Sequence, residues 1–236
     1  MQAMGADVLV FNVGGIYAWY ESDVPFHTVN PHLPQTGDLL EEVIAACHRR
    51  GIKFIARFDF SKAADTIYLE RPWWFVRDKQ RHPQTIGAMR PGEWSLLMST
   101  CINSGYRNHE AAVPILNEAL TRYDIDGVFY NNPAYIPCHC EVCQKKHLEV
   151  FGEPLPEDLD WDMVWRINTE WTRLCAQDNL SLLYNEIKSI RDIPVVLYHG
   201  VYSPPVDGVK TADMVCTEPQ NVLSRGHRDI PEFWRP

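Results

Sequence analysis

Short apolar runs alternate along this chain with longer amphipathic stretches, and this alternation constrains its fold more than any other feature. The pattern is typical of βα units, in which parallel strands form a buried sheet covered by helices. The predicted strands cover residues 7–13, 52–60, 94–99, 125–130, 193–198 and 213–218. The predicted helices cover residues 38–50, 108–123 and 158–190. The sequence therefore predicts an α/β protein with a parallel sheet.

The spacing of the predicted strands favours one kind of parallel sheet. Successive strands begin about 41 residues apart on average, which is long for a doubly wound sheet and suits a (β/α)₈ TIM barrel with extended loops. The chain has 236 residues, and those that follow Glu218 are too few for two more strands with their helices. We therefore predict one TIM-barrel-like domain over residues 1–236, either a fragment of a longer barrel that is incomplete at its C-terminal end or a barrel closed in an unusual way.

Charge and hydropathy exclude two classes of partner. The formal net charge is −9 and basic residues do not cluster, which disfavours a nucleic-acid backbone as partner. The longest apolar runs are far shorter than the roughly 20 residues that cross a bilayer. The first residues carry no export signal, so we expect a soluble cytoplasmic protein, and the open edges of a short barrel favour a homo-oligomer.

The most specific local signal is the Cys-x-Cys-x-x-Cys run at residues 138–143. Three neighbouring thiolates are best satisfied by a shared metal ion, and tetrahedral Zn²⁺ takes a fourth soft ligand. Cys101 is the favoured fourth ligand, because in a barrel the loops that follow neighbouring strands lie side by side, and His139 and His147 are alternatives. We predict a structural zinc ion with four cysteine ligands, Cys101, Cys138, Cys140 and Cys143. Reduced thiols or a redox pair are the alternatives to a metal.

The three remaining cysteines fit positions inside the fold. Cys47 and Cys175 fall on apolar helix faces, and Cys216 lies inside a predicted strand. We expect all three to be buried free thiols.

Polar residues at the ends of the predicted strands are candidates for chemistry, since barrels place reactive groups at the carboxyl ends of their strands. Glycoside hydrolysis requires two facing carboxyl groups, and Asp59 and Glu218 are the carboxylates clearly placed at such ends. Asp59 has an alternative role as the ion-pair partner of Arg57, and Glu218 as a loop acid. The candidates for substrate binding are Arg57, Asn131, Asn132, His199, Trp19 and Tyr130.

Several segments together resemble the family called hypothetical glycosyl hydrolase 6. They are residues 14–20, 38–40, 51–61, 126–131 and 138–143. Members are (β/α)₈-barrel proteins, so the resemblance implies a barrel with β-galactosidase-like or α-L-fucosidase-like activity on a carbohydrate substrate. It also extends to the segment at 213–234 that contains Glu218.

The cysteine pattern is similar to that of glycoside hydrolase family 42 galactosidases, in which four cysteines hold a structural zinc. Those enzymes place a general-acid glutamate directly after an asparagine at the end of the fourth strand, whereas here Asn131 is followed by Asn132. Their nucleophile comes from a seventh strand, for which no segment is predicted here. The acid/base pair of that family is therefore not transferred to this chain.

Three functions are compatible with these residues. The leading hypothesis is a glycoside hydrolase that uses Asp59 and Glu218. The alternative is a non-catalytic carbohydrate-binding or truncated barrel module with a structural zinc. A zinc-dependent hydrolase is disfavoured, because four cysteine ligands leave no open position for water.

Overall fold

The main sheet of the protein is parallel, as the alternating pattern predicts. The computed structural model describes residues 5–86, 96–131, 136–157, 170–198 and 210–216. Within these residues the strand order is β1-β2-β6-β7-β8, with every neighbouring pair parallel. The strands are β1 Val8–Gly15, β2 Lys53–Asp59, β6 Gly127–Tyr130, β7 Val195–Tyr198 and β8 Met214–Cys216.

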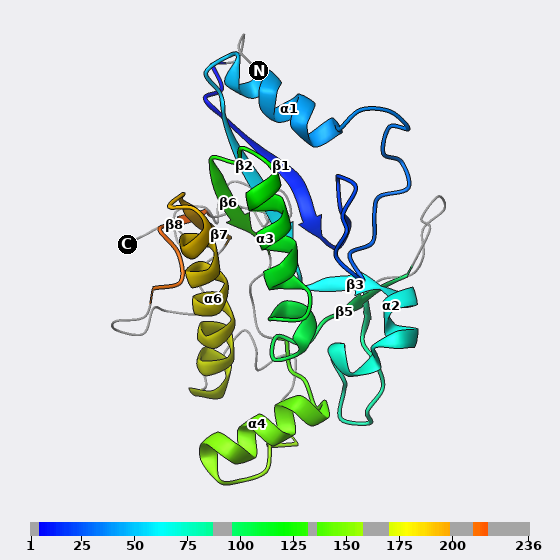
Figure 1. Ribbon diagram of the computed structural model, residues 1–236. Coiled ribbons are helices and arrows are strands. Elements are labelled where there is room, and N and C mark those ends of the chain that lie inside the picture. Colours follow the sequence, from blue (N-terminus) through cyan, green and yellow to red (C-terminus); the bar gives the residue numbers. More distant parts are fainter. Residues whose placement is uncertain (1–4, 87–95, 132–135, 158–169, 199–209, 217–236) are drawn as a thin grey trace, which may run out of the picture.

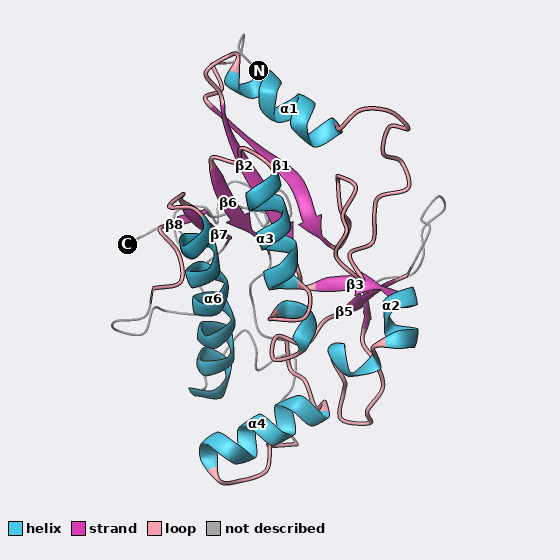
Figure 2. Cartoon of the chain, in the orientation of Figure 1, coloured by secondary structure: helices cyan, strands magenta, loops and turns pink. Residues whose placement is uncertain are grey.

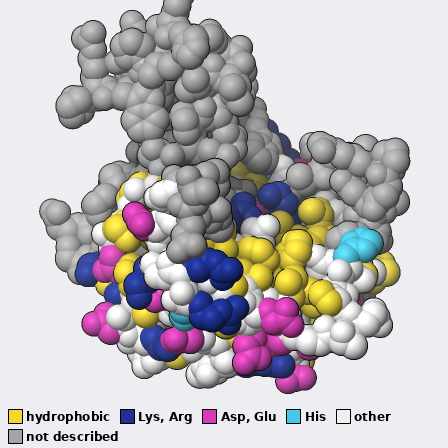
Figure 3. Space-filling model, turned by 90° about the horizontal axis from the view of Figure 1, so that it is seen from above, with side chains coloured by type: hydrophobic (Ala, Val, Ile, Leu, Met, Phe, Trp, Pro, Cys, Tyr) yellow, Lys and Arg dark blue, Asp and Glu magenta, His cyan; other side chains and the backbone are white. Residues whose placement is uncertain are grey.

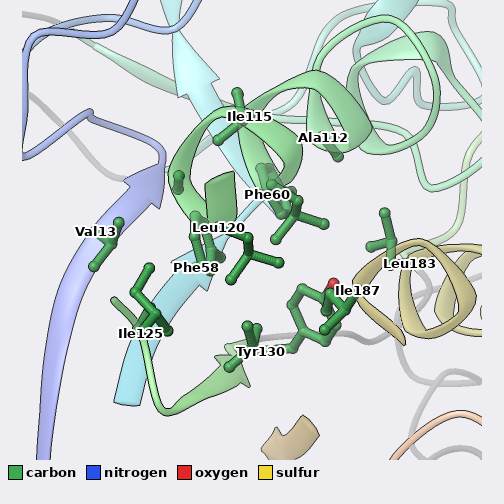
Figure 4. Packing of buried hydrophobic residues seen from close by; sticks show 14 of the residues in the cluster. Val13, Phe58, Phe60, Ala112, Ile115, Leu120, Ile125, Tyr130, Leu183 and Ile187 are labelled. Atoms are coloured by element: carbon green, nitrogen blue, oxygen red, sulfur yellow. The ribbon is translucent and has the colours of Figure 1, made fainter. Parts of the chain in front are cut away.

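Helices cover one face of this sheet (Figure 1). They are α1 Leu39–His48, α3 Ala112–Arg122 and α6 Glu170–Ile190. Alternate residues of β2, among them Phe54 and Phe58, are buried against these helices, and Figure 4 shows Phe58 among side chains from α3 and α6. The same alternation turns Arg57 and Asp59 to the opposite face. In a closed barrel that opposite face is the interior.

The helices follow the predicted periodicity closely. Asp38 caps α1, where its side chain accepts hydrogen bonds from the backbone N–H groups of Leu40 and Glu41. Gly51 has a positive φ of 68° after the end of α1. Residues 158–169 of the predicted long helix lie outside the described residues, and its remainder forms α6.

The predicted strand at 94–99 does not join the parallel sheet, which corrects that prediction. Its described part, β5 Leu97–Ser99, pairs antiparallel with β3 Lys62–Ala64 and with β4 Thr85–Ile86. A short apolar segment has no periodicity that reveals its partner, and here it closes a small sheet inside the long connection between β2 and β6. Strand β6 is therefore the third strand of the parallel sheet and β7 the fourth.

The small sheet lies at the carboxyl ends of the parallel strands (Figure 2). Four short helical elements accompany it at that end: α2 Asp65–Glu70, η2 Pro72–Trp74, η3 Gly105–Arg107 and α4 Glu141–Phe151.

The sheet remains open within the described residues, because β1 and β8 are its edges and do not pair with each other. Cys216 is exposed on β8, which corrects the expectation that it is buried. The reason is that an edge strand has a neighbour on one side only.

The amino ends of the strands carry ion pairs. Asp126 accepts hydrogen bonds from Lys53 Nζ at 2.7 Å and from the Phe54 N–H at 2.9 Å, and His48 Nε2 lies 2.7 Å from the same carboxylate. Seen from this end, acidic and basic side chains lie beside a group of hydrophobic ones (Figure 3). None of the described helices combines the length and apolar character that crossing a bilayer requires.

Candidate active site and metal centre

Asp59 ends β2 and forms the centre of a buried polar cluster. Its Oδ1 accepts hydrogen bonds from the backbone N–H of Ser61 at 2.9 Å and from the Ser61 hydroxyl at 2.5 Å. Its Oδ2 accepts from Asn131 Nδ2 at 2.7 Å, and Lys62 Nζ lies 3.7 Å away. Three hydrogen bonds therefore fix the orientation of the Asp59 carboxylate.

Arg57 precedes Asp59 by two residues on β2, so its side chain lies on the same face of the sheet. Its Nη1 donates to Asn12 Oδ1 at 2.5 Å, and the two residues are register partners on β2 and β1. The alternative role of Arg57 as the ion-pair partner of Asp59 is therefore wrong: the guanidinium turns to the neighbouring strand. Arg57, Asp59 and Asn131 thus lie together at the carboxyl ends of β2 and β6.

Two other candidates lie apart from this group. The Tyr130 side chain is buried in the core that faces α6 (Figure 4), where it packs with Phe60 at a ring separation of 6.5 Å. Trp19 packs edge-on against Phe11 at 6.0 Å. The candidates Asn132, His199 and Glu218 lie outside the described residues.

Two buried residues near Asp59 carry no signal in the sequence. Tyr106, in η3, donates its hydroxyl to the carbonyl oxygen of Gly15 at 2.9 Å. Arg107, the next residue, is only 2% exposed. Burial lowers the pKa of Arg107 to about 10, and the charges of Asp59 and Cys101 act in the opposite direction. A buried cationic side chain is therefore near enough to Asp59 and to Cys101 for the charge of each to act on it.

A hydrogen-bonded relay holds the loop after β1. The backbone N–H of Gly15 donates to His27 Nε2 at 3.2 Å, so the ring proton is on Nδ1, which donates to Ser22 Oγ at 2.9 Å. The Ser22 hydroxyl in turn donates to Glu118 Oε2 at 2.6 Å. Gly15 is required at this point, because a Cβ there would lie 2.2 Å from the carbonyl oxygen of Asp59 and its φ is +99°. The relay fixes the loop against the strand end that carries Asp59.

The buried imidazole of His27 makes stability depend on pH. Burial lowers the pKa of His27 to about 4 from 6.5, and the Glu118 charge offsets this in part. Below pH 6.5 His27 is protonated in the unfolded chain, whereas in the folded chain it is protonated only below about pH 4. The free energy of unfolding therefore falls as the pH falls from 6.5 to about 4. At pH 5.5 the expected loss from His27 is about 1.4 kcal/mol relative to pH 7.5.

Urea unfolding at the two pH values measures this loss. His27→Gln, which does not titrate, is the control, because other acidic and thiol groups act equally in both proteins. An equal pH dependence in the wild type and the variant would contradict the assignment.

Four buried cysteines lie close together beyond the carboxyl ends of the parallel strands. They are the predicted set, Cys101, Cys138, Cys140 and Cys143, with all four Sγ atoms within 4.8 Å of one another. Cys101 Sγ lies 3.3 Å from Cys143 Sγ and 3.7 Å from Cys140 Sγ. Four sulfurs at about 2.3 Å from a tetrahedral zinc ion are about 3.8 Å apart, so the cluster fits such an ion with little movement.

The alternative fourth ligand His147 has other contacts. Its Nδ1 lies 2.8 Å from the carbonyl oxygen of Glu153, and its ring packs against Phe151 and Trp171. The choice of Cys101 is therefore confirmed as a member of the cluster. Cys101 reaches it from the small antiparallel sheet, since it follows β5, and not from a neighbouring barrel strand as the prediction assumed.

The start of α4 favours negative charge on two of the four cysteines. Cys140 is the N-cap of α4 and Cys143 lies in its first turn, where the helix dipole favours negative charge. The hydrogen bonds from Cys101, Cys138 and Cys143 lower the pKa of Cys140, whereas the hydrogen bonds of Cys101 with the other three cysteines raise the pKa of Cys101. The Arg77 backbone N–H donates to Cys138 Sγ at 3.5 Å. The donor set is thus that of a closed metal site with four sulfur ligands.

Comparison with known proteins identifies one matching family. The family described as "Hypothetical glycosyl hydrolase 6" matches residues 1–132. No curated protein sequence matches the chain.

Solved glycoside hydrolases share the fold. The structure is similar to "Alpha-L-fucosidase isoenzyme 2 from Paenibacillus thiaminolyticus", with a TM-score of 0.63 and 21% identity over 84% of this chain and 28% of that one. It is similar to the β-galactosidase from Bacillus circulans sp. alkalophilus, with a TM-score of 0.54 and 15% identity over 84% of this chain and 33% of that one. The α-galactosidase TtGalA from Thermus thermophilus gives 0.50 and 12% identity over 89% and 36%.

These likenesses show that the fold is of the TIM-barrel type. This chain spans between 28% and 36% of the length of the three enzymes.

Proposed function

The chain belongs to the hypothetical glycosyl hydrolase 6 family, and on this basis we propose that it is a glycoside hydrolase that cleaves O-glycosidic bonds. The α-L-fucosidase and β-galactosidase folds that it resembles favour an α-L-fucoside or a β-galactoside as substrate. We further propose that it acts as a soluble cytoplasmic protein.

The observation that carries this proposal is the polar group on the barrel-interior face at the carboxyl ends of β2 and β6. Asp59 and Asn131 are hydrogen-bonded to each other there, and Arg57 lies on the same face beside Asn12. Such a group offers a carboxylate, amides and a cation to the hydroxyls of a sugar. Barrel enzymes place their reactive groups at this end of the strands.

We propose different roles for the two candidate carboxylates, Asp59 and Glu218. Three hydrogen bonds hold the Asp59 carboxylate in place, and we assign to it the stabilisation of the positive charge that develops on the sugar ring in the transition state. The proton for the leaving group then comes from Glu218, which follows β8 by two residues in the sequence. Asn131, Asn132, His199 and Arg57 are assigned to substrate hydroxyls.

The cysteine cluster is proposed to hold a structural zinc ion. A zinc ion bound by four thiolates would crosslink the loop after β5 to the start of α4. Its closed coordination leaves no position for a water nucleophile, so the chemistry stays with the carboxylates.

A panel of nitrophenyl glycosides, including the β-galactoside and the α-L-fucoside, tests the function, with zinc quantified in the same sample. We expect turnover of at least one glycoside and about one zinc ion per chain. Binding on a glycan array without turnover of any glycoside would overturn the proposal in favour of a carbohydrate-binding module, which the open sheet of the described residues would then explain.

A further inference from the structure

The Asn103 side chain lies between two cysteine sulfurs, of which only one belongs to the cluster. Its Nδ2 lies 3.3 Å from Cys143 Sγ and 3.1 Å from Cys175 Sγ, on α6. An amide nitrogen carries two hydrogens, so it can donate to both sulfurs at once. Cys175 is completely buried but is not among the four sulfurs that converge.

The same amide is held from its other side by a cation. Asn103 Oδ1 accepts a hydrogen bond from Lys146 Nζ at 2.9 Å, and Lys146 forms an ion pair with Asp178 at 2.7 Å. This contact fixes the orientation of the amide, because the oxygen must face the ammonium and the nitrogen must then face the sulfurs. The three residues line an open cavity of about 600 Å³, which lies between the segment at 102–110 and α6 and to which α4 contributes Lys146.

The charges of this arrangement match a metal–thiolate centre. Four thiolates around a divalent cation carry two net negative charges, and groups that donate hydrogen bonds to the sulfurs offset them. The Arg77 backbone N–H is one such donor, to Cys138 Sγ, and the Asn103 side chain, oriented by Lys146, is another, to Cys143 Sγ. Such outer contacts orient metal ligands and tune metal affinity.

We propose that Asn103, oriented by Lys146, is a positioning residue of the metal centre that sets how tightly it holds its ion. The N–H donor keeps Cys143 in place as a thiolate ligand, and the second N–H keeps the Cys175 sulfur outside the coordination shell. The inference rests on the proposed zinc site.

Asn103→Asp tests it, because aspartate has nearly the same shape but donates no hydrogen bond and adds a negative charge beside the sulfurs. We expect the zinc dissociation constant, measured by competition with a chromophoric chelator, to rise about 10–100-fold. In the cobalt-substituted protein we expect the sulfur-to-cobalt absorption band to shift, since the sulfur loses its hydrogen bond. Lys146→Gln is expected to raise the dissociation constant in the same direction by a smaller factor.

Asn185→Asp is the matched control. It makes the same change of charge and shape in the lining of the same cavity, and within the part of the chain that the structure describes no hydrogen bond joins Asn185 to a sulfur. If Asn103→Asp and Lys146→Gln both keep the wild-type zinc affinity and cobalt spectrum, the inference is wrong. Absence of zinc and cobalt binding by the wild type would instead overturn the proposed zinc site itself. Circular dichroism of each zinc-saturated variant separates loss of affinity from loss of fold.

Discussion

Cys143→Ser is expected to abolish stoichiometric zinc binding and to lower the free energy of unfolding by about 5 kcal/mol in the presence of zinc. Structural zinc sites in small domains contribute roughly 10–16 kcal/mol of apparent binding free energy. The loss here is smaller, because an apolar cluster around the site remains. That cluster includes Val76, Ile102, Leu155 and Trp171. Zinc content and urea unfolding of the purified variant measure both effects.

Cys47→Ser provides the matched control, since Cys47 is also buried but lies in the core beneath α1, far from the cluster in the sequence and in the fold. It places the same hydroxyl in an apolar site without touching a metal ligand, so it should retain zinc and lose only about 1–2 kcal/mol. Cys175→Ser should also retain zinc. Equal losses in the Cys47 and Cys143 variants, with no zinc in the wild type, would show that the cluster is a set of reduced thiols.

The parallel sheet could be predicted from the sequence because its signals are local. Apolar runs such as the one in β2 alternate with helices whose ends are marked, for example by Asp38 and Gly51. The small sheet could not be predicted, because β3 and β5 have three residues each and their pairing depends on contacts far apart in the chain. One strand was therefore assigned to the wrong sheet.

The candidate site was predictable to a different degree for each kind of residue. Close spacing revealed three of the cysteines, and Asp59 was recognised from its place at a strand end. Arg107 and Asn103 gave no signal, since Arg107 lies in the short helix η3 and Asn103 in the loop before it, and the role of each depends on how this segment folds back. Tyr130 was a candidate for substrate binding because it ends a predicted strand. Its side chain lies on the helix side of the sheet, and the position in the sequence alone did not reveal this.

Asp59→Asn is expected to lower kcat on the glycoside found by the panel by about 10²–10⁴-fold, the range typical of a lost catalytic carboxylate. Asparagine fills the same space, but it has no negative charge to offer a developing cation. Its amide group would also oppose the donors of Ser61, Asn131 and Lys62. Some loss of stability should accompany the substitution, so kcat is measured well below the thermal transition of the variant.

Asp126→Asn separates catalysis from stability. Asp126 also accepts several hydrogen bonds, from Lys53 and the Phe54 N–H, but at the amino ends of the strands. Burial alone would raise the pKa of Asp126, yet these hydrogen bonds lower it, so its carboxylate stabilises the fold at neutral pH. Its asparagine variant should lose about 1–3 kcal/mol of stability and keep kcat. If Asp59→Asn behaves in the same way, losing stability and keeping kcat, then Asp59 is an anchor for Asn131 and the loop after β2, and the negative charge at the reacting sugar must come from another residue.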